Sequence, residues 1–188
     1  MLKRYSALDE NYIVGKYPVK KKINLKFKEH KNLLLQQLSF WPKSFIESLN
    51  FIKNELNSDQ IPDFNKGSVF TDHSLWRMEP FKFWLLGKQL NLPEELGTDL
   101  DLSQAFTCIE ITGEDIPLFL NRHLPVDLRE NVFVFPASAS SAIHHVSVKL
   151  LKFSIDKYYL FIPRGFALSI WEILLETSKQ FGYEILDR

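Results

Sequence analysis

The chain has 188 residues, of which 45% are hydrophobic, so it can bury a core as one domain or as two small halves. Lysine plus arginine and aspartate plus glutamate each number 23, which leaves no long-range field favouring nucleic acid or an anionic membrane, and we predict neither as a partner. The single cysteine, Cys108, excludes an intrachain disulfide and a cysteine-rich metal site. With no apolar run near the roughly 20 residues that span a bilayer, we expect a cytoplasmic protein.

The first 22 residues show no periodic pattern and are predicted to form an N-terminal arm. Tyr5, Tyr12 and Tyr17 lie among lysines and arginines in this segment. A tyrosine combines an apolar ring with a polar tip, so such an arm can dock on a partner through its rings. A disordered tail is the equally weighted alternative.

Residues 23–188 are predicted to form one domain, whose first half ends near residue 99. Periodicity and turn residues predict these elements in the first half: strands at 23–28 and 32–40, a helix from Pro42 to about Asn57, a loop at 58–68, two strands about Glu79-Pro80 within 74–86, and a short helical turn or connection at 91–99. Residues 23–86 therefore give a β-α-β-β order.

The second half, about 100–188, is organised around a strand, a turn and a helix in immediate succession at 101–129. The predicted elements of this half are a strand ending at Gly113, a helix at 116–124, strands at 140–153 and 158–162, a helix from Phe166 to Phe181, and a strand at 183–186. This β-α-β-β-α-β order is a split βαβ unit of ferredoxin-like type, of which the first half is a weaker copy. We predict an α+β fold in which two ferredoxin-like β-α-β-β-α-β-type halves share one core.

His144 and His145 are the most conspicuous polar pair. Both fall within the predicted strand 140–153, where consecutive side chains point to opposite faces, so we expect His144 toward the core and His145 toward solvent. No Cys, Asp or Glu lies at ligand spacing beside them, which favours a structural or interface role over a metal or acid–base role. The other histidines are isolated and expected at the surface: His30, His73 and His123.

Motifs for nucleophilic, nucleotide or metal chemistry are not found in the sequence. Ser103 lacks a nucleophile-elbow pattern, and the seven scattered glycines form no phosphate-binding turn. Glu110, Glu114 and Asp115 gather at a strand-to-helix turn, where capping and solvation explain them. The sequence therefore predicts no catalytic, cofactor-binding or metal-binding residue in this chain.

Large aromatic residues are frequent, with 16 phenylalanines and four tryptophans, and aromatics are enriched at protein interfaces. A core that simply uses phenylalanine, with the hairpin at 74–86 packed on the first helix, is the alternative. The residues that we predict for contact with a partner are Tyr5, Tyr12, Tyr17, Trp76, Trp84 and Arg164.

Six segments, in one order and spread over nearly the whole chain, match the motifs of one family. The central match is Asp101-Leu-Ser-Gln-Ala-Phe-Thr-Cys-Ile-Glu-Ile-Thr-Gly113, against the pattern D-L-S-x-x-x-T-x-I-x-[IL]-x-G. The others are Arg4–Leu8, Leu75–Leu86, Leu118–Leu128, Ser141–Leu150 and Tyr158–Glu172. Together they resemble the gamma subunits of heterotetrameric sarcosine oxidases. The chain departs from the family at Glu79-Pro80, where Gly-Pro is frequent, and at Leu174, where the family has a second tryptophan.

The resemblance implies a fold similar to the folate-binding domain of the glycine-cleavage T-protein, and a non-catalytic structural subunit with alpha, beta and delta subunits as partners. Such flavin-dependent complexes demethylate sarcosine to glycine oxidatively, transfer the one-carbon unit to tetrahydrofolate and form H2O2. FAD, FMN, NAD, zinc and tetrahydrofolate are then expected in the partner subunits, with no cofactor bound by this chain.

Two alternatives stay open within the same superfamily. One is a subunit of a related N-methyl amino acid dehydrogenase of the N-methylglutamate type. The other is a free-standing folate-binding or tRNA-modification-related protein, although the K-x-C motif of that group is absent around Cys108. The catalytic acid of the T-protein corresponds by position to the neighbourhood of His144-His145, where this chain has no carboxylate, so the resemblance does not extend to folate catalysis.

Overall fold

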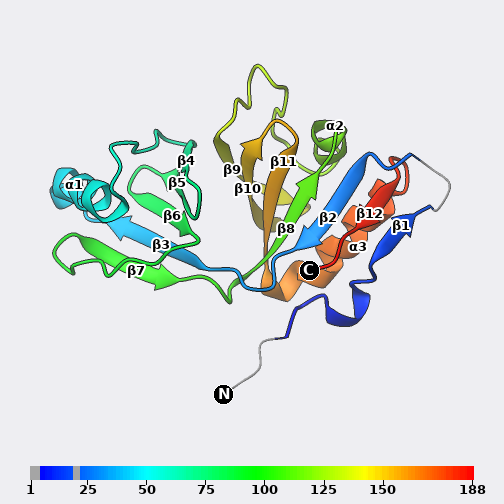
Figure 1. The fold of residues 1–188 in the computed structure, drawn as a ribbon, viewed down its shortest axis with the longest axis horizontal. Coiled ribbons are helices and arrows are strands. Elements are labelled where there is room, and N and C mark those ends of the chain that lie inside the picture. The colour runs from blue at the N-terminus through cyan, green and yellow to red at the C-terminus, as the bar shows by residue number, and fades with distance from the viewer. Residues whose placement is uncertain (1–4, 19–21) are drawn as a thin grey trace. The chain divides into compact units, whose positions relative to one another are not determined.

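The structure is a computed structural model that describes residues 5–18 and 22–188. Residues 1–4 and 19–21 of the predicted arm, including Arg4 of the first motif, lie outside the described residues. The chain forms two compact units (Figure 1). Unit 1 comprises Met1–Lys31, Ala105–Phe135 and Ser140–Arg188, and unit 2 comprises Asn32–Gln104 and Pro136–Ala139.

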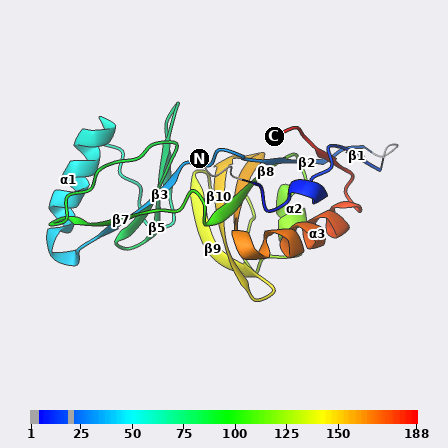
Figure 2. The same cartoon turned by 90° about the horizontal axis from the view of Figure 1, so that it is seen from below.

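Unit 1 contains its helices and almost all of a seven-stranded sheet, one strand of which begins within the segment Pro136–Ala139 of unit 2. The strand order is β1-β12-β2-β8-β11-β10-β9. The strands are β1 (Gly15–Tyr17), β2 (Leu25–Glu29), β8 (Phe106–Thr112), β9 (Ala137–Ile143), β10 (Val146–Ser154), β11 (Lys157–Pro163) and β12 (Tyr183–Ile185). The helical elements are η1 (Asp9–Asn11), α2 (Ile116–Leu120), η3 (Arg164–Phe166) and α3 (Ala167–Ser178). The helices α2 and α3 lie on the same face of the sheet (Figure 2).

The row of side chains facing these helices shows why the sequence pattern folds this way. Phe27 pairs with Ile111, Ile111 with Tyr158, and Tyr158 with Lys152, and all four side chains are buried. Because alternate residues of a strand share a face, the period of two in the sequence places one apolar row on the core. From α3, Trp171 is fully buried against Phe27, with ring centroids 5.7 Å apart.

Unit 2 is a five-stranded antiparallel sheet with one long helix. The strand order is β4-β5-β6-β3-β7. The strands are β3 (Leu35–Phe40), β4 (Gly67–Val69), β5 (Ser74–Glu79), β6 (Lys82–Leu86) and β7 (Gly97–Asp101), and the helices are η2 (Pro42–Ser44) and α1 (Phe45–Leu56). The core joins Leu38, Leu75, Phe83 and Leu85 of the sheet to Ile52 of α1. Asn57 ends α1 in the left-handed conformation, with φ 48°.

The two units share a strand order. In unit 2 the order β5-β6-β3-β7 places the second, third, first and fourth strands of the pattern side by side. Unit 1 repeats this as β10-β11-β8-β12, with β2 inserted between β8 and β12. This is the order of a ferredoxin-like split βαβ unit. The predicted α+β class with two such sheets is therefore confirmed.

Two predictions differ from the structure: the strand that starts the first copy, and the bounds of the two halves. The strand predicted at 23–28 does not start the first copy, because β2 pairs with β12 and β8 in unit 1. The copy in unit 2 begins at β3 instead, so the units differ from the predicted halves, 23–99 and 100–188. Such pairings join residues distant in sequence, and the local period does not encode them.

The strand predicted at 140–153 is in fact a hairpin. β9 and β10 are joined by a turn at His144-His145, in which His144 has φ 52°. Both histidines are exposed, so the expectation that His144 faces the core is wrong. The turn contains no glycine, asparagine or proline, so its composition does not predict a turn.

Two segment ends differ from their predictions in part. The short helical turn or connection predicted at 91–99 is present as a turn at 94–96, but the strand β7 already begins at Gly97. At its start, a Cβ on Gly97 would lie 2.2 Å from the Ser39 carbonyl oxygen, so this strand contact requires glycine. Phe166, predicted to pack in the last helix, precedes α3 and is 48% exposed.

In the part of the chain that the structure describes, no helix is long and apolar enough to cross a membrane.

Candidate functional site

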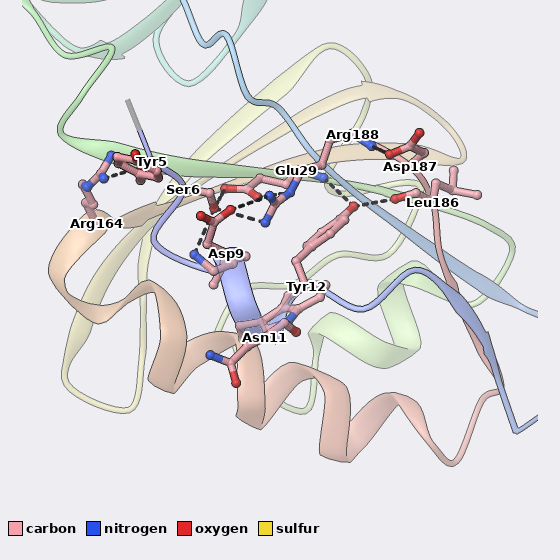
Figure 3. Close-up of polar contacts among 12 residues, drawn as sticks. Tyr5, Ser6, Asp9, Asn11, Tyr12, Glu29, Arg164, Leu186, Asp187 and Arg188 are labelled. Atoms are coloured by element: carbon pink, nitrogen blue, oxygen red, sulfur yellow. Dashed lines mark hydrogen bonds and ion pairs between the residues drawn. The ribbon is translucent and has the colours of Figure 1, made fainter. Parts of the chain in front are cut away.

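The described part of the arm folds back on unit 1 and is held there by Tyr12 (Figure 3). The Tyr12 hydroxyl donates to the Leu186 carbonyl at 2.7 Å and accepts from the Glu29 backbone N–H at 3.0 Å. Its ring stacks on Trp171, with centroids 5.7 Å apart. Burial raises the pKa of Tyr12 above its ordinary value. Tyr12 is thus part of the unit's own packing and offers little surface to a partner.

A buried carboxylate of β2 joins the arm to the residues that follow β12. Glu29 is 4% exposed, and its Oε1 accepts from the Ser6 hydroxyl at 2.5 Å. The Nε of Arg188 lies 2.8 Å from Glu29 Oε2 in an ion pair, and its Nη1 donates to Asp9 at 3.1 Å. The guanidinium carbon lies 4.3 Å from the centre of the Tyr12 ring. These contacts fix the arm, β2 and the residues after β12 to one another.

One part of this network, the position of Glu29, is indicated by the sequence. Glu29 continues the alternation of Leu25 and Phe27, so its side chain points to the core face of β2. A carboxylate on a core face must find a cation or donors, because an unpaired buried charge is costly. The identity of that cation, Arg188, depends on the parallel pairing of β12 with β2, which no local pattern shows.

The other two predicted arm residues lie closer to the surface. Tyr5 is 62% exposed, and its backbone carbonyl accepts from the Arg164 guanidinium (Figure 3). Tyr17 is half-buried and stacks on Tyr183, with centroids 5.1 Å apart. Its hydroxyl donates to the Ile13 carbonyl at 3.3 Å. Of the six residues predicted for an interface, Tyr5 offers the largest exposed side chain, and Arg164 lies beside it.

The two predicted tryptophans are buried in unit 2. Trp76 and Trp84 are cross-strand neighbours in the β5–β6 hairpin and are 0% and 3% exposed. The indole N–H of Trp76 donates to the Ser74 hydroxyl at 2.8 Å, and that of Trp84 to the Gln37 side-chain carbonyl at 3.4 Å. Both rings therefore serve the hairpin's own packing, and an interface role for the predicted set stays a prediction.

A second ionic cluster lies on the face of the seven-stranded sheet opposite α2 and α3. Glu110 Oε2 is 3.2 Å from His30 Nε2 and 3.5 Å from Lys157 Nζ. The His30 and Tyr159 rings are in contact, with centroids 4.8 Å apart. Burial raises the pKa of Glu110, but hydrogen bonds from His30 and Tyr159 and the charge of Lys157 outweigh it, and the pKa falls to about 2.

This cluster holds charge but is poorly matched to proton transfer near neutral pH. A carboxylate with a pKa near 2 is a weak base, and efficient general bases have a pKa near the working pH. Burial, together with the negative charge of Glu110, raises the pKa of Tyr159, so its phenol stays protonated. The prediction that His30 is isolated is wrong, because β2 and β8 are neighbours and bring it to Glu110.

The remaining candidates for chemistry are separated from one another. In the described ranges, no group of three or more His, Cys, Asp or Glu residues could hold a metal ion. Cys108 is 1% exposed, as expected for a core residue, and burial raises the pKa of its thiol well above the ordinary value. Burial also lowers the pKa of His123, helped by the nearby charges of His144 and Arg122. A neutral imidazole and a protonated thiol are the states that these surroundings favour.

Comparisons with known proteins give matches of fold. No protein-family profile matches the chain, and no curated protein sequence does. A chain of heterotetrameric sarcosine oxidase from Corynebacterium sp. U-96, in complex with pyrrole 2-carboxylate, superimposes with a TM-score of 0.78 at 15% identity, over 95% of this chain and 96% of that one.

Glycine cleavage system aminomethyltransferase T from Bartonella henselae superimposes with a TM-score of 0.63 at 13% identity, over 88% of this chain. This chain spans about half of that protein, 48% of its length. Both likenesses concern the fold, and they confirm the predicted similarity to sarcosine oxidase and T-protein folds.

Proposed function

We propose that this chain is a non-catalytic structural subunit of a heterotetrameric, flavin-dependent sarcosine oxidase. One observation carries the proposal: the chain matches the fold of one whole chain of such an enzyme, with 95% and 96% of the two lengths covered. A chain that has the length and fold of a complete subunit is suited to occupy that subunit's place. By contrast, it matches less than half of the aminomethyltransferase.

The assembly in this proposal demethylates sarcosine oxidatively to glycine. The one-carbon unit passes to tetrahydrofolate, and the electrons pass through flavin to oxygen, which becomes H2O2. FAD, FMN, NAD, zinc and tetrahydrofolate belong to the alpha, beta and delta subunits, and the assembly is cytoplasmic.

The ionic clusters of unit 1 support a structural role. The carboxylates of Glu29 and Glu110 are both engaged with cations of the same unit, Arg188 at 2.8 Å and Lys157 at 3.5 Å. The pKa of Glu110 lies far below neutrality, and that of Tyr159 lies above its ordinary value. Groups arranged in this way stabilise a fold better than they exchange protons with a substrate.

The test is to purify the tagged chain from its native host. We expect three further chains to co-purify, together with a flavin absorption band near about 450 nm, since flavins carry the redox chemistry of such oxidases. Adding sarcosine to the purified material should then consume oxygen and form H2O2. A colourless monomer without amine-dependent activity would contradict the proposal.

Two related functions are distinguished by simple assays. A complex that oxidises N-methylglutamate and passes electrons to an acceptor other than oxygen would place the chain in a related dehydrogenase. The likeness to aminomethyltransferase T over 88% of this chain favours a free-standing folate-binding protein as the second candidate. Saturable micromolar binding of tetrahydrofolate to the isolated chain would support that candidate.

A further inference from the structure

Two hollows lie beside α1 in unit 2, and two adjacent residues of its first turn, Glu47 and Ile46, line one each. The first has a volume of about 540 Å³ and the second of about 400 Å³. The first is lined by Trp41, Pro42, Lys43, Ser44, Glu47 and Glu95. The second is lined on one side by residues of α1, among them Ile46, which is 74% exposed, and on the other by residues within 59–63 and Arg77. We call Trp41, Pro42, Ile46, Glu47 and Glu95 the α1 surface.

The apolar residues of this surface are not needed by the core of unit 2. The stripe of α1 that packs on the sheet is centred on Ser48, Ile52 and Leu56, all buried, and the partly buried Phe45, Leu49 and Phe51 flank it. Ile46 lies off this stripe, since residues two and six apart fall on different sides of a helix. It therefore exposes a large apolar side chain without contributing to the unit's own packing.

Trp41 is exposed but rigidly held. Its ring is 47% exposed, while its indole N–H donates to the Glu94 carbonyl at 2.9 Å and its backbone N–H to the Leu96 carbonyl at 3.0 Å. A tryptophan already fixed in place loses little conformational entropy on binding. Rigid tryptophans beside an apolar pocket are typical centres of protein interfaces.

The charges around the first hollow select the kind of partner. Glu47 and Glu95 line it, with Lys43 as the cation beside them, and all three side chains are exposed. Within the described residues, neither carboxylate forms an ion pair. The lining therefore carries two negative charges against one positive. A second copy docking by the same surface would bring the carboxylates together, which is unfavourable, whereas lysine or arginine side chains would be complementary.

We propose that the α1 surface docks a polypeptide segment of a partner subunit. The segment presents an apolar side chain to Trp41 and Ile46, and lysine or arginine side chains to Glu47 and Glu95. Taking this partner to be a subunit of the oxidase assembly rests on the proposed function.

The test compares two isoleucines with similar exposure in the full assembly. Ile46→Asp puts a charge at the centre of the α1 surface, and Ile155→Asp puts the same charge in the exposed β10–β11 turn of unit 1, where Ile155 is 62% exposed. Each tagged variant is produced together with the other subunits, and the co-purified chains and flavin are quantified. We expect Ile46→Asp to weaken retention of the partners at least tenfold and Ile155→Asp to leave it unchanged, with both melting temperatures close to that of the unchanged chain.

A charge variant keeps the test decisive if Ile46→Asp unfolds. Glu47→Lys combined with Glu95→Lys changes only exposed side chains, and we expect it to weaken partner retention and to reduce its sensitivity to salt. Amide hydrogen exchange of α1 should also be slower in the complex than in the isolated chain.

The outcomes separate this inference from the proposed function. If the unchanged chain retains no partner, the proposed function fails and the docking surface fails with it. If the unchanged chain retains flavin-containing partners and the Ile46 and glutamate variants retain them equally well, the α1 surface alone is wrong. A dimer of the isolated chain that Ile46→Asp abolishes would also overturn it, because the occupant would then be a second copy.

Discussion

In unit 1 the chain passes from the β10–β11 hairpin to the last strand, β12, through the helix α3, whereas in unit 2 it passes from the β5–β6 hairpin to β7 through the helix-free segment 87–96. The strand order around both connections is the same. In unit 1, apolar side chains of α3 such as Ile170 and Leu174 are buried. The two units therefore hold the same strand pattern together by different means.

In unit 2, one buried side-chain amide holds the segment that takes the place of the helix. Gln36 is 3% exposed, and its Nε2 donates to the Leu90 carbonyl at 2.7 Å and to Asp99 at 2.8 Å. Its Oε1 accepts from the Leu90 backbone N–H at 2.8 Å. A helix satisfies its own backbone groups, but an irregular segment needs partners for them, and Gln36 supplies these partners for both backbone groups of Leu90. A connection without a helix therefore requires a specific polar residue, whereas a helical connection requires only an apolar face.

Unit 1 uses polar residues at a different place, the junction of arm and sheet. Glu29→Gln is expected to lower the free energy of unfolding by about 3 kcal/mol, because Arg188 would keep a largely buried charge with only Asp9 opposite. Chemical denaturation measures the loss, and hydrogen exchange should locate it in unit 1. The matched control is Glu184→Gln, whose ion pairs with Lys16 and Lys26 span 3.8 and 4.0 Å near the surface. Equal losses in the two variants would show that burial of the pair has no special weight.

The corresponding change in unit 2 is Gln36→Leu. We expect a loss of about 2 kcal/mol, since the N–H and carbonyl of Leu90 lose their partners while the leucine gains some apolar burial. Amide exchange should accelerate at Leu90 and in β7 and stay unchanged in β8. Gln37→Leu is the control, because the bonds of Gln37 to Trp84 and Ser39 are longer, at 3.4 and 3.2 Å. Faster exchange in both units at once would mean that they unfold together.

The parts of this fold that the sequence predicts are those with a strong local period. The helix from Pro42 to Asn57, the hairpin about Glu79-Pro80, β8 and the last helix are present where the pattern places them. In β10, Lys152 shares the core face with Val148 and Leu150 and is 2% exposed, and its ammonium donates to the Phe133 carbonyl at 2.8 Å. Amphipathic periodicity is a property of neighbouring residues, so one sequence is enough to show it.

What the sequence did not predict depends on pairing over long distances or on unusual turns. The His144-His145 turn lacks turn-forming residues, and the insertion of β2 between β12 and β8 joins the two ends of the chain. The contact of His30 with Glu110 spans 80 residues. The alternation in β2 indicates that Glu29 faces the core, but the partners of Glu29 and Glu110 cannot be identified without these pairings, because each partner taken alone is an ordinary surface residue type.

The hydroxyl of Tyr12 allows a test of how strongly the arm is attached to unit 1. Tyr12→Phe removes a hydroxyl that bridges the Glu29 N–H and the Leu186 carbonyl, and we expect a loss of about 1.5 kcal/mol because a buried N–H is left unpaired. Tyr17→Phe removes one longer, exposed bond to Ile13 and should change stability by less than about 0.5 kcal/mol. Thermal unfolding measures both. A similar small shift for both variants would indicate that the arm is only loosely attached.

The Glu110 cluster is a further difference between the two units. It makes the stability of unit 1 depend on pH, whereas the amide of Gln36 in unit 2 does not titrate. The pKa of Glu110 falls from its ordinary value of 4.5 to about 2, so its ionised form stabilises the fold above pH 4.5, and this contribution disappears as the pH falls toward 2. Between about pH 5 and 3.5, we expect the unchanged chain to lose about 1 kcal/mol more than Glu110→Gln, whose side chain does not titrate.

Glu114→Gln provides the control for that pH profile, because Glu114 is 82% exposed in its pair with Lys22. Its urea denaturation midpoints should follow those of the unchanged chain at every pH, while the Glu110→Gln profile should be flatter and should start from a lower stability at pH 7. If the Glu110→Gln and Glu114→Gln profiles coincide, the charge of Glu110 contributes no more than a surface carboxylate does. The face of the sheet opposite α2 and α3 would then be held by its aromatic contacts, such as the one between Phe153 and Tyr159, whose centroids are 4.2 Å apart.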